Sequence, residues 1–158
     1  MICFDTIEGR FNFRSVAVIV HNDHMLIHRN VIDDFWALPG GRVGFFENSE
    51  ETIQREILEE LGYKSKVERH IWHVENFFEY GSKKFHEIAN YFLVSLLPDH
   101  PMNSELDFEG IETKVNLIFR WVLLNNLKSY NLKPAFLIGK LNDLPSSTKM
   151  VKINELHA

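Results

Sequence analysis

Residues 41–63 read GRVGFFENSEETIQREILEELGY, and this segment contains the clearest helix pattern in the chain. Ser49 is a favourable N-cap residue, and Glu50 and Glu51 follow in what would be the first turn, where the helix dipole favours acidic side chains. Gly62 can adopt the left-handed conformation in which helices commonly end. The pattern predicts a helix over residues 50–61, with Ser49 as its N-cap.

Three glutamates of this helix would share one side of it. Successive helical residues are about 100° apart, so Glu56, Glu59 and Glu60, at positions i, i+3 and i+4, fall within one arc. Ile53 and Ile57 fall on an adjoining apolar stripe that can pack on a sheet. Mg²⁺ or Mn²⁺ would relieve the repulsion between the three carboxylates, because these cations prefer carboxylate oxygens as ligands. For three glutamates taken alone, an acidic face that binds only water is the alternative.

The spacing of the fixed residues resembles the Nudix box of the Nudix hydrolases, the MutT-like proteins. That box consists of Gly, five residues, Glu, seven residues, Arg-Glu, an aliphatic residue, any residue, Glu-Glu, any residue, Gly, and an aliphatic or aromatic residue. Every fixed position is present, in Gly41, Glu47, Arg55, Glu56, Ile57, Glu59, Glu60, Gly62 and Tyr63. With average residue usage, a chance match has a frequency on the order of 10⁻⁹ per starting point. The similarity extends over residues 12–145 and is most specific over residues 38–63.

The resemblance implies a fold of the α/β (α+β) class. In this fold a mixed β-sheet lies between helices as an α/β/α sandwich, here a single domain over residues 1–158. The resemblance also implies a site for Mg²⁺ or Mn²⁺ with Glu56, Glu59 and Glu60 as ligands, and with the backbone carbonyl of Gly41 as a further ligand. Glu47 would assist metal binding or orient the loop.

The reaction implied by the resemblance is the attack of water on a phosphorus of a diphosphate, with catalytic roles for Glu59, Glu56 and Arg55. Arg55 would pair with the box carboxylates and hold them in place. Glu59 is the first candidate for the general base that takes the proton of the water. The alternatives are three acids in or just after a long polar loop, Glu105, Glu109 and Glu112.

Outside the box, strand patterns surround the helix. Apolar and β-branched runs bounded by turn residues predict strands over residues 15–20, 25–28, 66–78, 85–97 and 118–123. We expect a polar loop over residues 98–110, a short helix or turn over residues 125–129, and a last helix from Pro134 to Leu141. The tail after Pro145 has no clear pattern.

Four residues are candidates for contacts with the substrate. Phe45 and Phe46 are consecutive aromatics inside the predicted catalytic loop. Tyr80 lies 17 residues after Tyr63, where dinucleoside polyphosphate hydrolases of similar sequence often have tyrosine. Glu87 lies in a predicted strand with one face toward the cleft.

The expected substrate is a small nucleotide-type compound, a nucleoside diphosphate linked to another group. Nucleoside triphosphates, dinucleoside polyphosphates and 5′-triphosphate RNA ends are open alternatives within the enzyme class. A nucleotide-binding sensor domain without catalytic activity is the alternative outside it, although such domains usually lack some of the box glutamates.

Composition argues against several other classes of protein. The 158 residues carry a net charge of −5, which is unsuited to general binding of nucleic acid backbones. No apolar run approaches the roughly 20 residues of a membrane span, and the N-terminus has no signal-peptide pattern, so we expect a cytoplasmic protein without a membrane partner. Cys3 is the only cysteine, so no internal disulfide can form. We expect a monomer or a homodimer.

Overall fold

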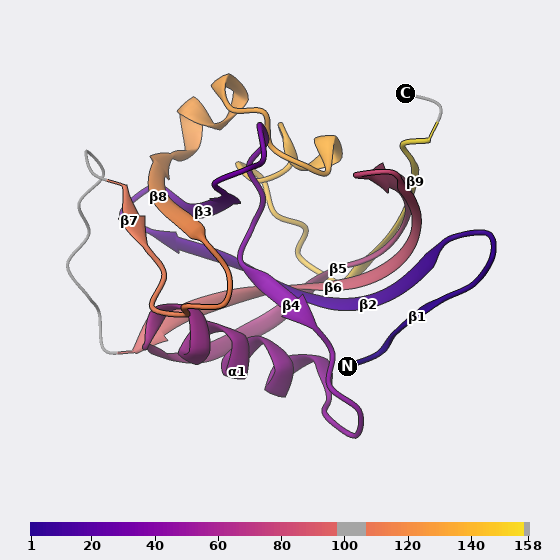
Figure 1. The fold of residues 1–158 in the computed structure, drawn as a ribbon. Helices are drawn as coiled ribbons and strands as arrows, with labels where there is room; N and C mark the ends of the chain where they lie inside the picture. The colour runs from indigo at the N-terminus through magenta and orange to yellow at the C-terminus, as the bar shows by residue number, and fades with distance from the viewer. Residues whose placement is uncertain (98–106, 157–158) are drawn as a thin grey trace.

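The computed structural model describes residues 1–97 and 107–156, and within these residues nine strands form one mixed sheet (Figure 1). The strands are β1 (Cys3–Asp5), β2 (Arg10–His21), β3 (His24–Asn30), β4 (Gly40–Arg42), β5 (Lys64–Tyr80), β6 (Lys83–Leu97), β7 (Phe108–Glu109), β8 (Leu117–Leu123) and β9 (Lys149–Asn154). Their order is β7-β8-β3-β2-β6-β5-β9, and β1 and β4 pair with β2 outside this path. β2 runs parallel to β6 and β5 runs parallel to β9, whereas the other pairs are antiparallel. All five predicted strands are confirmed.

The sheet has a hydrophobic core on each face, because β2 alternates its apolar side chains between them. Val16 and Val18 belong to one core, and Ala17 and Ile19 belong to the other. β2 lies between β3 and β6 in the middle of the sheet, and each of its faces packs into one of the two cores. This position explains why residues 15–20 are apolar almost throughout.

A single α-helix among the described residues, α1 (Ser49–Leu61), covers one face of the sheet (Figure 1). Its residues Ile53 and Ile57 are fully buried in the same core as Ala17 and Ile19. The opposite face is covered by two 3₁₀ helices, η1 (Leu124–Ser129) and η2 (Ala135–Leu137). The mixed sheet of the α+β class is confirmed, and the layer opposite α1 consists of short 3₁₀ helices. No helix among the described residues is both long and apolar enough to cross a membrane.

The structure corrects two predicted boundaries. The N-cap of α1 is Asn48 rather than Ser49, because the Asn48 side chain accepts a hydrogen bond from the backbone N–H of Glu51 at 2.9 Å. The Glu51 carboxylate in turn accepts from the backbone N–H of Asn48, which completes a capping box. The predicted last helix from Pro134 to Leu141 is wrong beyond η2, because Gly139 has a φ of 86°, which a right-handed helix does not contain.

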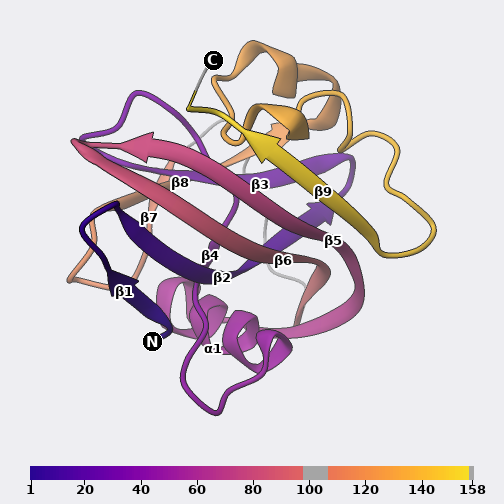
Figure 2. The same ribbon diagram turned by 90° about the vertical axis from the view of Figure 1, so that its right-hand side faces the viewer.

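The polar tail after Pro145 contributes a strand. β9 pairs with β5 over Lys149–Asn154, and Figure 2 shows it lying along the outer side of β5. The predicted loop over residues 98–110 ends in β7, and residues 98–106, which include Glu105, lie outside the described part of the chain.

Candidate active site

Gly41 brings β4 into close contact with α1. β4 is held by β2, and Ser15 of β2 pairs with Gly41 in the register. A Cβ atom at Gly41 would overlap the carboxyl group of Glu56, so only glycine allows this close approach of strand and helix. The backbone of Gly41 and the carboxylate of Glu56 therefore lie side by side, as the predicted site requires.

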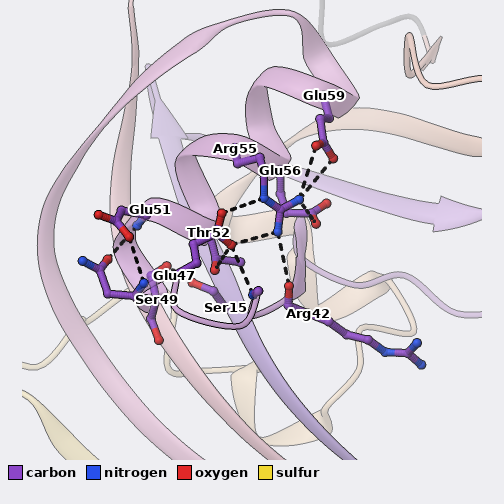
Figure 3. A network of polar contacts seen from close by, with 11 residues as sticks. Ser15, Arg42, Glu47, Ser49, Glu51, Thr52, Arg55, Glu56 and Glu59 are labelled. Atoms are coloured by element: carbon purple, nitrogen blue, oxygen red, sulfur yellow. Dashed lines mark hydrogen bonds and ion pairs between the residues drawn. The ribbon is translucent and has the colours of Figure 1, made fainter. Parts of the chain in front are cut away.

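Arg55 lies at the centre of the polar network between the loop and α1 (Figure 3). Its guanidinium donates to both carboxylate oxygens of Glu47, at 2.9 and 3.0 Å, in a bidentate pair. It also donates to Glu56 at 2.9 Å and to Glu59 at 3.3 Å, and it reaches the backbone carbonyl of Arg42 at 3.4 Å. One cation thus holds three of the predicted site carboxylates and the end of β4.

Glu47 anchors the loop that precedes α1. Besides Arg55, its carboxylate accepts from the Thr52 hydroxyl at 2.6 Å and from the backbone N–H of Gly44 at 3.2 Å. Hydrogen bonds from Arg55 first, and then from Thr52, lower the pKa of Glu47 to about 2. Glu47 is therefore ionised at neutral pH and anchors the loop. Its carboxylate oxygens are hydrogen-bonded to Arg55, Thr52 and Gly44.

Glu60 is the most buried carboxylate of α1. It is only 5% exposed, and its Oε2 atom has no hydrogen-bond partner among the described residues. Burial first, and then the nearby charge of Glu56, raise the pKa of Glu60 to about 8, against an opposing effect from Arg14. Burial also raises the pKa of Glu56, although Arg55 opposes this. Two adjacent carboxyl groups that are costly to ionise form a pair that a hard cation would stabilise.

Glu59 has a different environment from Glu56 and Glu60. Its side chain is 48% exposed and pairs with Arg55. Within residues 1–97 and 107–156, no three His, Cys, Asp or Glu side chains converge closely enough to hold a metal ion. The structure thus brings together Glu56, Glu60 and the Gly41 backbone, and it leaves Glu59 beside them on the solvent side.

Glu112 is the alternative base whose position in the structure bears on the site. Its charge raises the pKa values of both Glu56 and Glu60. Glu109 lies in β7, and Glu105 lies outside the described residues. Of the three alternative bases, Glu112 is the one that the structure places electrostatically close to the box glutamates.

A cleft of about 680 Å³ lies on the sheet face opposite α1, and it receives two of the four predicted substrate contacts. Tyr80 and Glu87 line this cleft, and the Tyr80 hydroxyl donates to the carboxylate of Asp33 at 3.0 Å. Burial raises the pKa of the Glu87 carboxyl, and Arg14 opposes this effect. Phe45 and Phe46 are 70% and 98% exposed at the loop between β4 and α1, and neither lines the cleft.

Several polar residues of the cleft were missed by the sequence reasoning. Arg10, Asn12 and Arg14 occupy alternate positions of β2, and all three line the cleft. Their spacing of two residues could have predicted that they lie together, because alternate residues of a strand share a face. Arg42 was missed as well, and Figure 3 shows its side chain pointing away from Arg55 while its carbonyl faces that residue.

Fold and site together define a class of α+β protein in which a loop and a helix on one face of the sheet carry the carboxylates, and the opposite face holds a cleft. The NUDIX domain profile matches residues 12–137, which is more than half of the chain, so the chain belongs to the Nudix family. This membership confirms the expected enzyme class, the hydrolases of phosphorus-containing acid anhydrides. No curated protein is a significant match by sequence.

Solved structures of similar fold extend over most of the chain. The MutT protein of Bacillus halodurans has a TM-score of 0.65 at 14% identity, and the match covers 92% of this chain and 90% of that one. A UDP-X diphosphatase has a TM-score of 0.59 at 23% identity, over 89% of this chain but 66% of that one. An ADP-ribose pyrophosphatase of Streptococcus suis has a TM-score of 0.57 at 14% identity, over 89% and 98%. At these identities the likeness establishes the fold alone.

Proposed function

We propose that the chain is a divalent-cation-dependent pyrophosphohydrolase that cleaves a nucleoside diphosphate linked to another group. The observation that carries this proposal is the adjacent pair of Glu56 and Glu60: Glu60 is buried with one oxygen left without a partner among the described residues, and the Glu56 side chain is only 12% exposed. A purely structural helix gains nothing from burying two adjacent carboxyl groups. A cation held by them would bind the phosphate oxygens of a substrate that reaches the cleft.

The residues of the candidate site would then have different roles. Glu56, Glu60 and the Gly41 carbonyl would hold Mg²⁺ or Mn²⁺, and Glu59 would join them by exchanging its contact with Arg55. When bound, the cation would polarise the phosphoryl oxygens and lower the pKa of the attacking water. Arg55 and Glu47 would keep the carboxylates in position, since both are fixed by several hydrogen bonds.

Glu59 is the proposed general base. It is exposed and lies at the solvent side of the box, so an incoming water can reach it. Glu112 is the candidate that would replace it if Glu59 serves only as a metal ligand. The masses of the products would show which phosphorus the water attacks.

The test is a panel of nucleotide anhydrides incubated with Mg²⁺ or Mn²⁺, with products resolved by mass. We expect hydrolysis by the wild type and a loss of at least about 100-fold in Glu60→Gln, since the variant removes a metal ligand. Glu50→Gln changes an exposed residue at the start of the same helix and serves as the matched control. Nucleotide binding without turnover by the wild type would instead favour a sensor domain. The cytoplasmic location and the monomeric or dimeric state stay predictions.

A further inference from the structure

Ser49, the first residue of α1, contacts a row of three polar side chains on the sheet. In the register, Ser15 of β2 lies opposite Asn90 of β6, and Asn90 lies opposite His73 of β5. Residues opposite one another on neighbouring strands point to the same face. For this row it is the face that α1 covers, because Ser15 alternates with Ala17, which belongs to the core shared with α1. We call Ser15, Asn90 and His73 the Ser49-binding row.

The Ser49-binding row holds Ser49 through hydrogen bonds to its backbone and to its side chain. The hydroxyl of the completely buried Ser15 donates to the backbone carbonyl of Ser49 at 2.6 Å (Figure 3). The Nδ2 atom of Asn90 donates to the Ser49 hydroxyl at 3.0 Å, and the Oδ1 atom of Asn90 lies 2.6 Å from Nδ1 of His73. Because an amide oxygen can only accept, His73 donates through Nδ1 and fixes the orientation of the Asn90 amide.

Ser49 lies on the same side of α1 as the two least exposed box glutamates. Glu56 and Glu60 follow it by seven and eleven residues, so at about 100° per residue they are rotated from it by only about 20°, in opposite directions. A rotation or a shift of α1 at Ser49 would therefore move both carboxylates. The apolar contacts of Ile53 and Ile57 do not prevent such a movement alone, because the burial of apolar surface is not directional.

Ser15 also connects Ser49 to β4. Its backbone pairs with Gly41 in the register, while its side chain holds the carbonyl of Ser49. A Cβ atom at Gly41 would lie 2.2 Å from the Cδ atom of Glu56, so β4 and α1 are too close for any side chain at this position. One residue of β2 thus contacts both the strand that supplies the Gly41 carbonyl and the start of the helix that supplies Glu56.

We propose that Ser15, Asn90 and His73 are positioning residues for the candidate metal site. The Ser49-binding row sets the rotation of α1 and its position against β4, and thereby the geometry in which Glu56 and Glu60 hold a divalent cation. This inference rests on the proposed function, because it assigns residues that act through the proposed metal ligands. Residues that orient metal ligands typically contribute about 10- to 100-fold to metal affinity.

The experiment measures the binding of Mn²⁺ alone, without nucleotide, from the electron paramagnetic resonance signal of the free ion. Ser15→Ala and Asn90→Leu each remove a contact to Ser49, and each should raise the Kd for Mn²⁺ about tenfold. Asn90→Asp retains an acceptor for His73, and the Ser49 hydroxyl can rotate to donate to it. The Kd of Asn90→Asp should therefore stay within about threefold of the wild-type value.

Val94→Ala is the matched control for a general loss of stability. Val94 lies four residues beyond Asn90 on the same face of β6, and it is buried in the core that α1 shares. Its truncation should lower the urea midpoint of unfolding without removing a hydrogen bond to Ser49. The Kd of Val94→Ala for Mn²⁺ should therefore equal that of the wild type.

The possible failures of this inference and of the proposed function are distinguishable. Wild-type affinity for Mn²⁺ in Ser15→Ala and Asn90→Leu, with nucleotide anhydrides still hydrolysed by the wild type, would overturn the positioning role and leave the proposed function standing. A similar loss of affinity in Val94→Ala, or an equal loss in Asn90→Asp and Asn90→Leu, would also overturn the positioning role. A wild type that binds no Mn²⁺ would overturn both proposals.

Discussion

Glu60 links the proposed chemistry to the stability of the fold. Its pKa is about 8 in the folded chain against an ordinary value of 4.5. Its contribution to stability is therefore fully present below pH 4.5 and is lost as the pH rises through 8. Without metal, Glu60→Gln should raise the free energy of unfolding by roughly 1–3 kcal/mol at pH 9 and by little at pH 5.

Urea unfolding in EDTA at the two pH values measures this difference. With metal present, the wild type should gain stability relative to Glu60→Gln. Mg²⁺ should raise the melting temperature of the wild type and leave that of Glu60→Gln nearly unchanged. An equal gain in stability at pH 5 and pH 9 would show that burial of the charge is not the cause.

His28 provides a second pH dependence, of opposite sign. It is buried against Phe119 and its Nδ1 atom has no partner among the described residues, so burial first, and then the charge of Arg14, lower its pKa from 6.5 to about 3. Its contribution to stability is present above pH 6.5 and is lost as the pH falls toward 3, because the unfolded chain binds the proton first. Between pH 7 and pH 5 the wild type should lose about 2 kcal/mol more than His28→Leu does. Parallel pH profiles for the two proteins would contradict this reading of His28.

For single residues, the sequence predicts which side chains form the candidate site better than it predicts how far each of them is buried. The box spacing places Glu56, Glu59 and Glu60 on one side of α1, and the structure agrees. Burial of Glu60 and exposure of Glu59 depend on how β2, β4 and β5 pack against α1, which a helical projection of α1 alone does not contain. The same applies to Asn12 and Asn76, which lie on either side of Glu87 because β2 pairs with the β5–β6 hairpin, far from it in the sequence.

The capping box of α1 fixes the element that carries the candidate site. Asn48→Ala removes the acceptor of the Glu51 N–H and should lower the free energy of unfolding by about 1 kcal/mol. Asn48→Asp retains an acceptor and places a negative charge at the helix N-terminus, so it should cost little. Urea unfolding of the two variants checks the assignment, and equal losses would show that the side-chain acceptor at position 48 is not what stabilises the helix.

Helix and strand types were predictable wherever a local pattern dominated, as in α1 and β2. The segment around Gly139 was not, because its helical spacing of Leu137 and Leu141 reflects two buried leucines joined by a turn with positive φ. β9 was not predictable either, since Lys149–Asn154 alternates only weakly in exposure and is a strand through its pairing with β5. Non-local pairing of this kind leaves little trace in the segment itself.

In the whole molecule, β2 and β4 carry residues that belong to the box on one face of the sheet and to the cleft on the other. β2 carries Arg14 toward the box and Asn12 into the cleft, and β4 carries Gly41 beside Glu56 and Arg42 beside Arg14. β9 then brings Glu155 against Asn76, 79 residues earlier in the chain. Glu155 and Leu156, which follow β9, thus form part of the cleft wall.

This long-range contact predicts coupling between the C-terminal segment and the sheet. Glu155→Ala leaves the buried Nδ2 atom of Asn76 without its acceptor and should lower the free energy of unfolding by about 1–3 kcal/mol. Asn76→Leu removes the amide as well as the need for an acceptor, so adding Glu155→Ala to it should have little further effect. A double-mutant cycle in urea should therefore give a coupling of about 1 kcal/mol or more between the two sites. Additive losses would mean that Glu155 and Asn76 act independently, and the segment after β9 would then have no energetic link to the sheet through this hydrogen bond.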